Sequence, residues 1–182
     1  LTTAALSVGD HALSAAFSGD PSFQGSITLD AQPLAVSQAA TTVAVASSVG
    51  PSVFGQPVDF TISVAPVAPG AGTPSGQVSV SIDGGDALLL DLADGQATFS
   101  SAALDVGPHL LDVSFLGDPS FLPSAGALAQ DVAQAASATE LVATAAASLF
   151  GEQVTFTATV TALAPGAGLP SGTVTFSDGA TL

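Results

Sequence analysis

Apolar and polar residues alternate along the middle of the chain with a period of two. The clearest run holds four apolar residues separated by three polar ones, namely Val58, Asp59, Phe60, Thr61, Ile62, Ser63 and Val64. Successive side chains of a strand point to opposite faces, so this run predicts a strand with one buried face. Similar patterns predict further strands near residues 42–46, 78–82, 88–92, 97–99, 109–115 and 125–132.

Short polar turns separate several of these predicted strands. Asp83-Gly84-Gly85-Asp86 is typical of a hairpin, because glycine accepts the positive φ that tight hairpin turns need, and Asp94-Gly95 indicates a further turn. No segment shows the longer period of an amphipathic helix. About seven short strands within roughly 100 residues predict an all-β fold, a Greek-key β-sandwich.

The sequence also repeats itself over long distances. Phe-Gly-Gln at 54–56 recurs as Phe-Gly-Glu at 150–152, and Ala-Pro-Gly-Ala-Gly at 68–72 recurs at 164–168, both 96 residues later. Gly-Asp-Pro-Ser-Phe at 19–23 recurs 98 residues later. A period of this length corresponds to a whole domain rather than to one turn of a solenoid.

This period divides the chain into three parts. Residues 1–36 are expected to be the C-terminal part of one repeat, 37–132 a complete repeat, and 133–182 the N-terminal part of another. The sequence has no Met, so we expect a segment of a longer protein. Neighbouring repeats in the same chain are then the expected partners of each repeat.

One motif indicates the type of sandwich. Immunoglobulin-like domains carry a Tyr near the start of strand F, two residues before a core Cys, and its hydroxyl bonds back to the backbone. His109 and Leu111 take these two places, and His11 and Leu13 repeat the arrangement. A histidine ring nitrogen is therefore predicted to make the same backbone bond.

Together these motifs resemble the bacterial Ig-like repeats that occur in tandem in large surface and secreted proteins. The segments that carry the resemblance are Phe54–Val58, Thr73–Gly76, Val106–His109 and Phe115–Asp118. The resemblance implies tandem immunoglobulin-like Greek-key sandwiches with about seven strands per repeat. It also implies a secreted or cell-surface location, a stalk or adhesin role, and no catalysis.

The charge balance excludes two classes of partner. Lys and Arg are absent, and 15 acidic residues give a formal charge of −15. Nucleic acid is excluded because no cations neutralise its phosphates, and anionic membrane surfaces are disfavoured for the same reason. The longest uncharged stretches carry Pro, Gly, Ser and Thr, so no membrane insertion is expected in this segment.

The residues offer no catalytic constellation. The two histidines hold the same position in different repeats, no Gly-x-Ser-x-Gly elbow occurs, and cysteine is absent. Gly-Asp-Pro-Ser resembles the start of a self-cleaving Gly-Asp-Pro-His motif but lacks its His. We therefore expect no catalytic residues and no enzyme, and a turn in which the Asp accepts backbone hydrogen bonds.

Calcium is the one cofactor that the sequence leaves open. It prefers oxygen ligands, and carboxylates are plentiful in this chain. If consecutive sandwiches meet pole to pole, Asp10 approaches Asp118 at one junction, and Asp131 joins Asp105 at the next. These four residues are the candidate junction ligands, although they form no Asp-x-Asp cluster.

Two functions fit these observations. The favoured hypothesis is a non-catalytic spacer in a secreted or cell-surface, adhesin-like protein. The alternative is an Ig-like binding module that recognises an extracellular glycan or host protein through its loop pole. The loop at Ala65–Gly76 belongs to such a pole, but it holds no aromatic or Arg anchor and recurs nearly unchanged, which favours the spacer.

Overall fold

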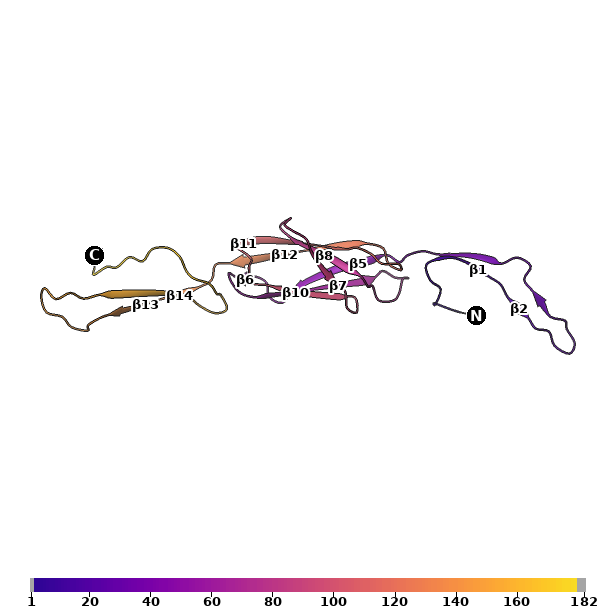
Figure 1. The fold of residues 1–182 in the computed structure, drawn as a ribbon, viewed down its shortest axis with the longest axis horizontal. Coiled ribbons are helices and arrows are strands. Elements are labelled where there is room, and N and C mark those ends of the chain that lie inside the picture. The colour runs from indigo at the N-terminus through magenta and orange to yellow at the C-terminus, as the bar shows by residue number, and fades with distance from the viewer. Residues whose placement is uncertain (1, 180–182) are drawn as a thin grey trace. The chain divides into compact units, whose positions relative to one another are not determined.

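A computed structural model of the chain describes residues 2–179, which form strands, turns and loops (Figure 1). None of these residues forms a helix long and apolar enough to cross a membrane. In chain order the strands are β1 (Gly9–Leu13), β2 (Ala16–Phe17), β3 (Ser26–Ile27), β4 (Gln32–Val36), β5 (Thr41–Ser47), β6 (Ser52–Val53), β7 (Val58–Pro66), β8 (Gln77–Ile82), β9 (Leu88–Asp91), β10 (Gln96–Ser101), β11 (Gly107–Phe115), β12 (Ser124–Ala133), β13 (Ser137–Ala143) and β14 (Phe156–Ala162).

The strands within residues 41–133 form two sheets. One has the strand order β10-β7-β5, and the other has the order β6-β12-β11-β8-β9. Strands β8 and β9 pair antiparallel, whereas the two-residue strand β6 runs parallel to β12. The predicted all-β class is confirmed, and the arrangement is that of an immunoglobulin-like sandwich. Strand β6 was not predicted, because two residues are too short to show a period.

The described chain forms two compact units. The first comprises the residues up to Val45 together with Ile62–Ala97 and Asp112–Ala127. The second comprises Ala46–Thr61, Thr98–Leu111 and the residues from Leu128 onward. The strands β5, β7, β10, β11 and β12 each contribute residues to both units.

Each unit has its own buried apolar residues. In the first unit they include Ile62, Val64, Val78, Val80, Val113 and Phe115. In the second they include Val58, Phe60, Leu104, Leu111 and Val132, and Phe60 stacks on Phe99 with ring centroids 5.0 Å apart. The alternation around Phe60 is therefore confirmed, since its apolar members are buried and Asp59 is exposed.

Both predicted turns form; the first joins β8 to β9 within one sheet, and the second lies between β9 and β10, which belong to different sheets. Asp83 and Gly84 have φ of 52° and 70°, and Asp94 and Gly95 have φ of 51° and 75°. Positive φ at both central positions is the geometry that suits the right-handed twist of the flanking strands. The amide of Gly85 donates to the carbonyl of Ile82 at 2.9 Å and closes the first of these turns.

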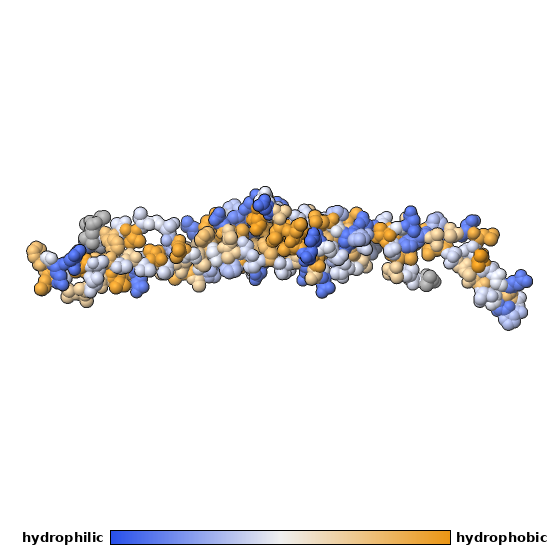
Figure 2. All heavy atoms as spheres, in the orientation of Figure 1, coloured by the Kyte–Doolittle hydropathy of each residue, from blue (hydrophilic) through white to orange (hydrophobic). Residues whose placement is uncertain are grey.

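The segments before β5 and after β12 leave large apolar side chains exposed. Phe115 is 1% exposed in the complete repeat, whereas its counterpart Phe17 is 48% exposed. Strand β11 is continuous between β12 and β8, but the matching residues of the first part form two short strands, β1 and β2, which pair only with β4 and β3. Figure 2 shows the apolar side chains (orange) that remain at the surface.

The predicted histidine corner is present in both copies. The ring Nε2 of His109 donates to the carbonyl oxygen of Asp105 at 2.7 Å, and that of His11 donates to the carbonyl oxygen of Ser7 at 2.7 Å. Both bonds span four residues along the chain. The histidines therefore fix the entry to a strand, in the place where other sandwiches use a Tyr.

Candidate functional site

The turn between β11 and β12 is organised by one carboxylate. Oδ1 of Asp118 accepts hydrogen bonds from the amides of Ser120 and Phe121, both at 2.8 Å. Oδ2 accepts from the amide and the hydroxyl of Ser75, at 2.9 and 2.8 Å. Asp118 thus closes its own turn, as the sequence predicts, and also ties that turn to the loop after β7.

The recurring motif at residues 19–23 forms a turn with the same internal geometry. Oδ1 of Asp20 accepts from the amides of Ser22 and Phe23 at 2.8 and 2.9 Å. The Gly-Asp-Pro-Ser-Phe motif therefore folds into the same turn in both copies. The hydrogen bonds from Ser75 were not predicted, because they join two loops that lie 43 residues apart in the sequence.

The hydrogen bonds determine how Asp118 titrates. Burial raises the pKa of its carboxyl, but the bonds from Ser75, Ser120 and Phe121 together outweigh that effect and hold the pKa below its ordinary value. The carboxylate is consequently ionised at neutral pH and acts as an acceptor. It has no feature of a general acid, which needs a raised pKa.

We expect Asp118→Asn to destabilise the folded state at neutral pH by about 1 kcal/mol. Both carboxylate oxygens of Asp118 accept hydrogen bonds, whereas an amide has only one acceptor oxygen and cannot accept from both Ser75 and the turn amides. The pKa of Asp118 is lowered on folding. Its contribution is therefore complete above the unfolded-state pKa and is lost as the pH falls through the lower folded-state pKa. Urea unfolding followed by circular dichroism across this acidic range measures both effects.

The exposed Asp112 on β11 provides a charge-matched control for this substitution. Asp112→Asn removes the same charge without removing a turn acceptor. The variant Asp118→Asn should show a smaller loss of stability on acidification than the parent chain. An acid response equal to that of the parent would contradict the assigned role.

The same turn also holds the linker that precedes the complete repeat. The side-chain amide of Gln38 donates to the carbonyl of Asp118 at 2.8 Å. Ala39 donates its amide to the carbonyl of Ser120 and accepts from the amide of Leu122, both at 2.9 Å. These bonds fasten residues 38–39 to one loop of the first unit.

The four candidate calcium ligands lie in different settings. Asp10 is exposed on β1, Asp131 is exposed on β12, and Asp105 uses its backbone carbonyl to accept from His109. The carboxylate of Asp118 is occupied by the donors described above. Within residues 2–179, no group of three or more His, Cys, Asp or Glu side chains could hold a metal ion. A junction calcium therefore stays a prediction.

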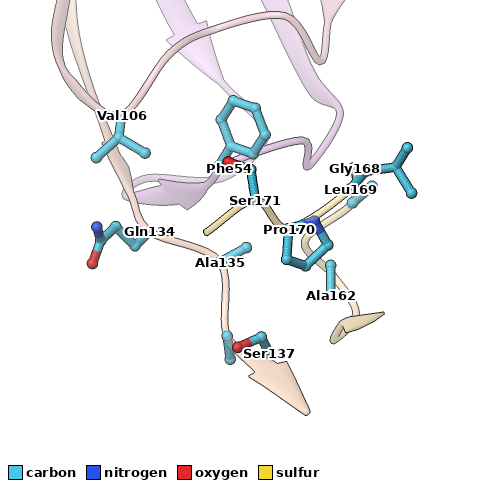
Figure 3. Close-up of a pocket in the computed structure, with 12 residues that line it drawn as sticks. Phe54, Val106, Gln134, Ala135, Ser137, Ala162, Gly168, Leu169, Pro170 and Ser171 are labelled. Carbon is cyan, nitrogen blue, oxygen red and sulfur yellow. The ribbon is translucent and has the colours of Figure 1, made fainter. Parts of the chain in front are cut away.

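A pocket of about 400 Å³ lies in the second unit, between the turn after β6 and the loop after β14 (Figure 3). Phe54 lies on one side of it, the linker residues Gln134 and Ala135 line another, and Gly168 and Pro170 belong to the facing loop. The size falls within the range of small-molecule sites. However, no charged side chain lines the pocket to orient a polar ligand, so we regard it as a contact between loops.

The comparisons with known proteins agree with this architecture. Residues 44–133 match the family model described as bacterial Ig-like domain (group 3), a range that runs from β5 to the end of β12. No curated protein matches the sequence significantly. The resemblance inferred from the motifs is thereby confirmed over the matched range, and residues 44–133 of the chain are a bacterial Ig-like domain of group 3.

Proposed function

We propose that the chain is a non-catalytic spacer from a secreted or cell-surface protein of the adhesin type. The supporting observation is that the complete repeat buries its own core, with Phe60, Leu111 and Phe115 almost inaccessible to solvent. A domain of this kind gains little from its neighbours, so further repeats add length without a redesigned core. The recurrence of the same motifs on both sides of it supports a tandem array.

The charge of the chain suits this role. A formal charge of −15 with no Lys or Arg keeps neighbouring chains apart and maintains solubility. The loop at 68–72, which lies at the pole where a binding module would carry its contacts, has no aromatic or charged residue and recurs unchanged at 164–168. A binding pole would be expected to vary and to carry anchors.

Inserting extra copies of residues 37–132 into the chain tests the proposal. We expect the maximum dimension from small-angle X-ray scattering to rise with each copy, because each copy folds around its own core and adds a further compact domain to the array. The series is measured in calcium and in chelator, so that any effect of a junction ion is seen separately. A dimension that stays nearly constant, as repeats collapse onto each other, would overturn the spacer.

A further inference from the structure

Two motifs of the repeat contact each other in the second unit. Phe54 and Gly55 form the turn after β6, and Ala167 lies in the loop after β14. The amide of Ala167 donates to the carbonyl oxygen of Phe54 at 3.2 Å. The turn itself is held by the carbonyl of Val53, which accepts from the amide of Gln56 at 3.0 Å.

Glycines permit this close approach on both sides. Gly55 has φ of +76°, and a Cβ added to it would overlap the carbonyl oxygen of Ala167 and lie 2.8 Å from its carbonyl carbon. A Cβ on Gly168 would lie 3.3 Å from the ring of Phe54. A Cβ on Gly166 would overlap the Cβ of Ala135 and lie 3.3 Å from the carbonyl oxygen of Phe54. The two backbones therefore meet with no room for side chains.

The loop on which the turn docks occurs twice in the chain. In the complete repeat, Ala39 packs on Gly70, where an added Cβ would lie 2.6 Å from the Cβ of Ala39. Ala135 and Gly166 repeat this contact 96 residues later. One position differs, since Gly72 faces the ring of Phe121 from its own repeat, whereas Gly168 faces Phe54. The close approach of Gly55 to Ala167 involves only backbone atoms of Ala167, so it does not depend on which phenylalanine ring faces the loop.

The turn also exists twice, and only one copy meets a following loop. Phe150 is fully exposed, and Gly151 has φ of +86° with nothing within 4 Å of an added Cβ. The turn therefore requires a positive φ at its glycine in both copies, whereas only Gly55 has another backbone, that of Ala167, close to it. Neither the turn at 54–55 nor the loop at 164–168 contains an acidic residue, so the contact avoids like-charge repulsion in a strongly acidic chain.

We propose that these two motifs form a repeat joint, defined as the Phe54–Gly55 turn of one repeat docked on the Ala164–Gly168 loop of the next. The joint holds consecutive repeats in one orientation, so the array is a stiff spacer rather than a flexible string. The inference rests on the proposed spacer function and deepens it. It also explains why these two loops recur with so little change, since each must fit the other at every junction.

The test compares Gly55→Ala with Gly151→Ala in the full chain. Both substitutions place alanine at a positive φ and share that strain, but only Gly55→Ala introduces the overlap with Ala167. The chain has no cysteine, so spin labels on Thr98→Cys in β10 and Thr159→Cys in β14 are unique. Pulsed electron–electron double resonance then gives the distribution of distances between the two labels.

We expect a narrow distribution in the parent chain and in Gly151→Ala, and one about twofold broader in Gly55→Ala, as for repeats joined by a free linker. Phe54→Ala, compared with Phe150→Ala, should show the same difference through loss of the ring contact. A distribution already broad in the parent, or one that is equal in Gly55→Ala and Gly151→Ala, would overturn the joint.

The scattering series and the distance measurement together distinguish a failure of the joint from a failure of the spacer function on which it rests. A maximum dimension that rises with each added copy, together with a broad distance distribution, would leave the spacer intact and remove the joint. Circular dichroism of each variant shows whether the sheets remain folded. Gly55→Ala should melt close to Gly151→Ala, because the joint lies outside the core.

Discussion

Truncation of Phe60 to alanine is expected to lower the free energy of unfolding by about 3–5 kcal/mol, the usual cost of removing a fully buried phenylalanine. Phe60 is 0% exposed and stacks on Phe99 at an interplanar angle of 23°. The substitution loses the burial of the ring, its stacking and the packing of its neighbours. Single domains are stable by only about 5–15 kcal/mol, so the variant should be close to unfolding at room temperature.

The chain provides a matched control for this substitution. Phe156 lies 96 residues later, at the equivalent position of β14, and is 49% exposed. Phe156→Ala should therefore change the stability of the complete repeat by less than about 0.5 kcal/mol, the range of ordinary surface substitutions. Native-state hydrogen exchange of the β7 amides measures both variants. Similar losses in the two would contradict the assignment of the core to the complete repeat.

The strands were predictable where burial alternates. The run from Val58 to Val64 forms β7, and the two Asp-Gly turns adopt the positive φ that their residues favour. The corner formed by His109 was also predictable, because its position relative to Leu111 matches a known corner and a ring nitrogen can replace a hydroxyl as donor. These features depend on residues close together in the sequence.

Contacts between distant loops were not predictable. The recurrence of the Phe54–Gly55 turn and of the loop at 164–168 indicates that both matter, but it does not show that they meet. The bonds from Ser75 to Asp118 join two loops whose distance depends on the whole sandwich. A single sequence gives local preferences, whereas these contacts depend on how the strands are placed by packing elsewhere.

The alternation of apolar and polar residues also did not predict one pair of buried polar side chains. Gln130 falls at an inward position of β12, where an apolar residue is expected, and it is buried together with Ser52 of β6. Its side-chain amide donates to the hydroxyl of Ser52 at 3.1 Å and to the carbonyl of Asp131 at 3.2 Å. Among the described residues, no buried side-chain polar atom lacks a hydrogen-bond partner. The pair is therefore satisfied, and it links the short strand β6 to the sheet.

Gln130→Ala is accordingly expected to lower the free energy of unfolding by about 2–4 kcal/mol, since it leaves a cavity and removes the hydrogen-bond partner of the buried Ser52 hydroxyl. The counterpart Gln32 is exposed in the first partial repeat, so Gln32→Ala should have little effect. The double variant Gln130→Leu with Ser52→Ala should recover much of the loss, because replacing both partners by apolar groups removes the unpaired atom. Urea unfolding of the parent chain, Gln130→Leu, Ser52→Ala and the double variant gives the coupling energy between the two side chains. If the double variant is as unstable as Gln130→Ala, the cost comes from packing rather than from the hydrogen bond.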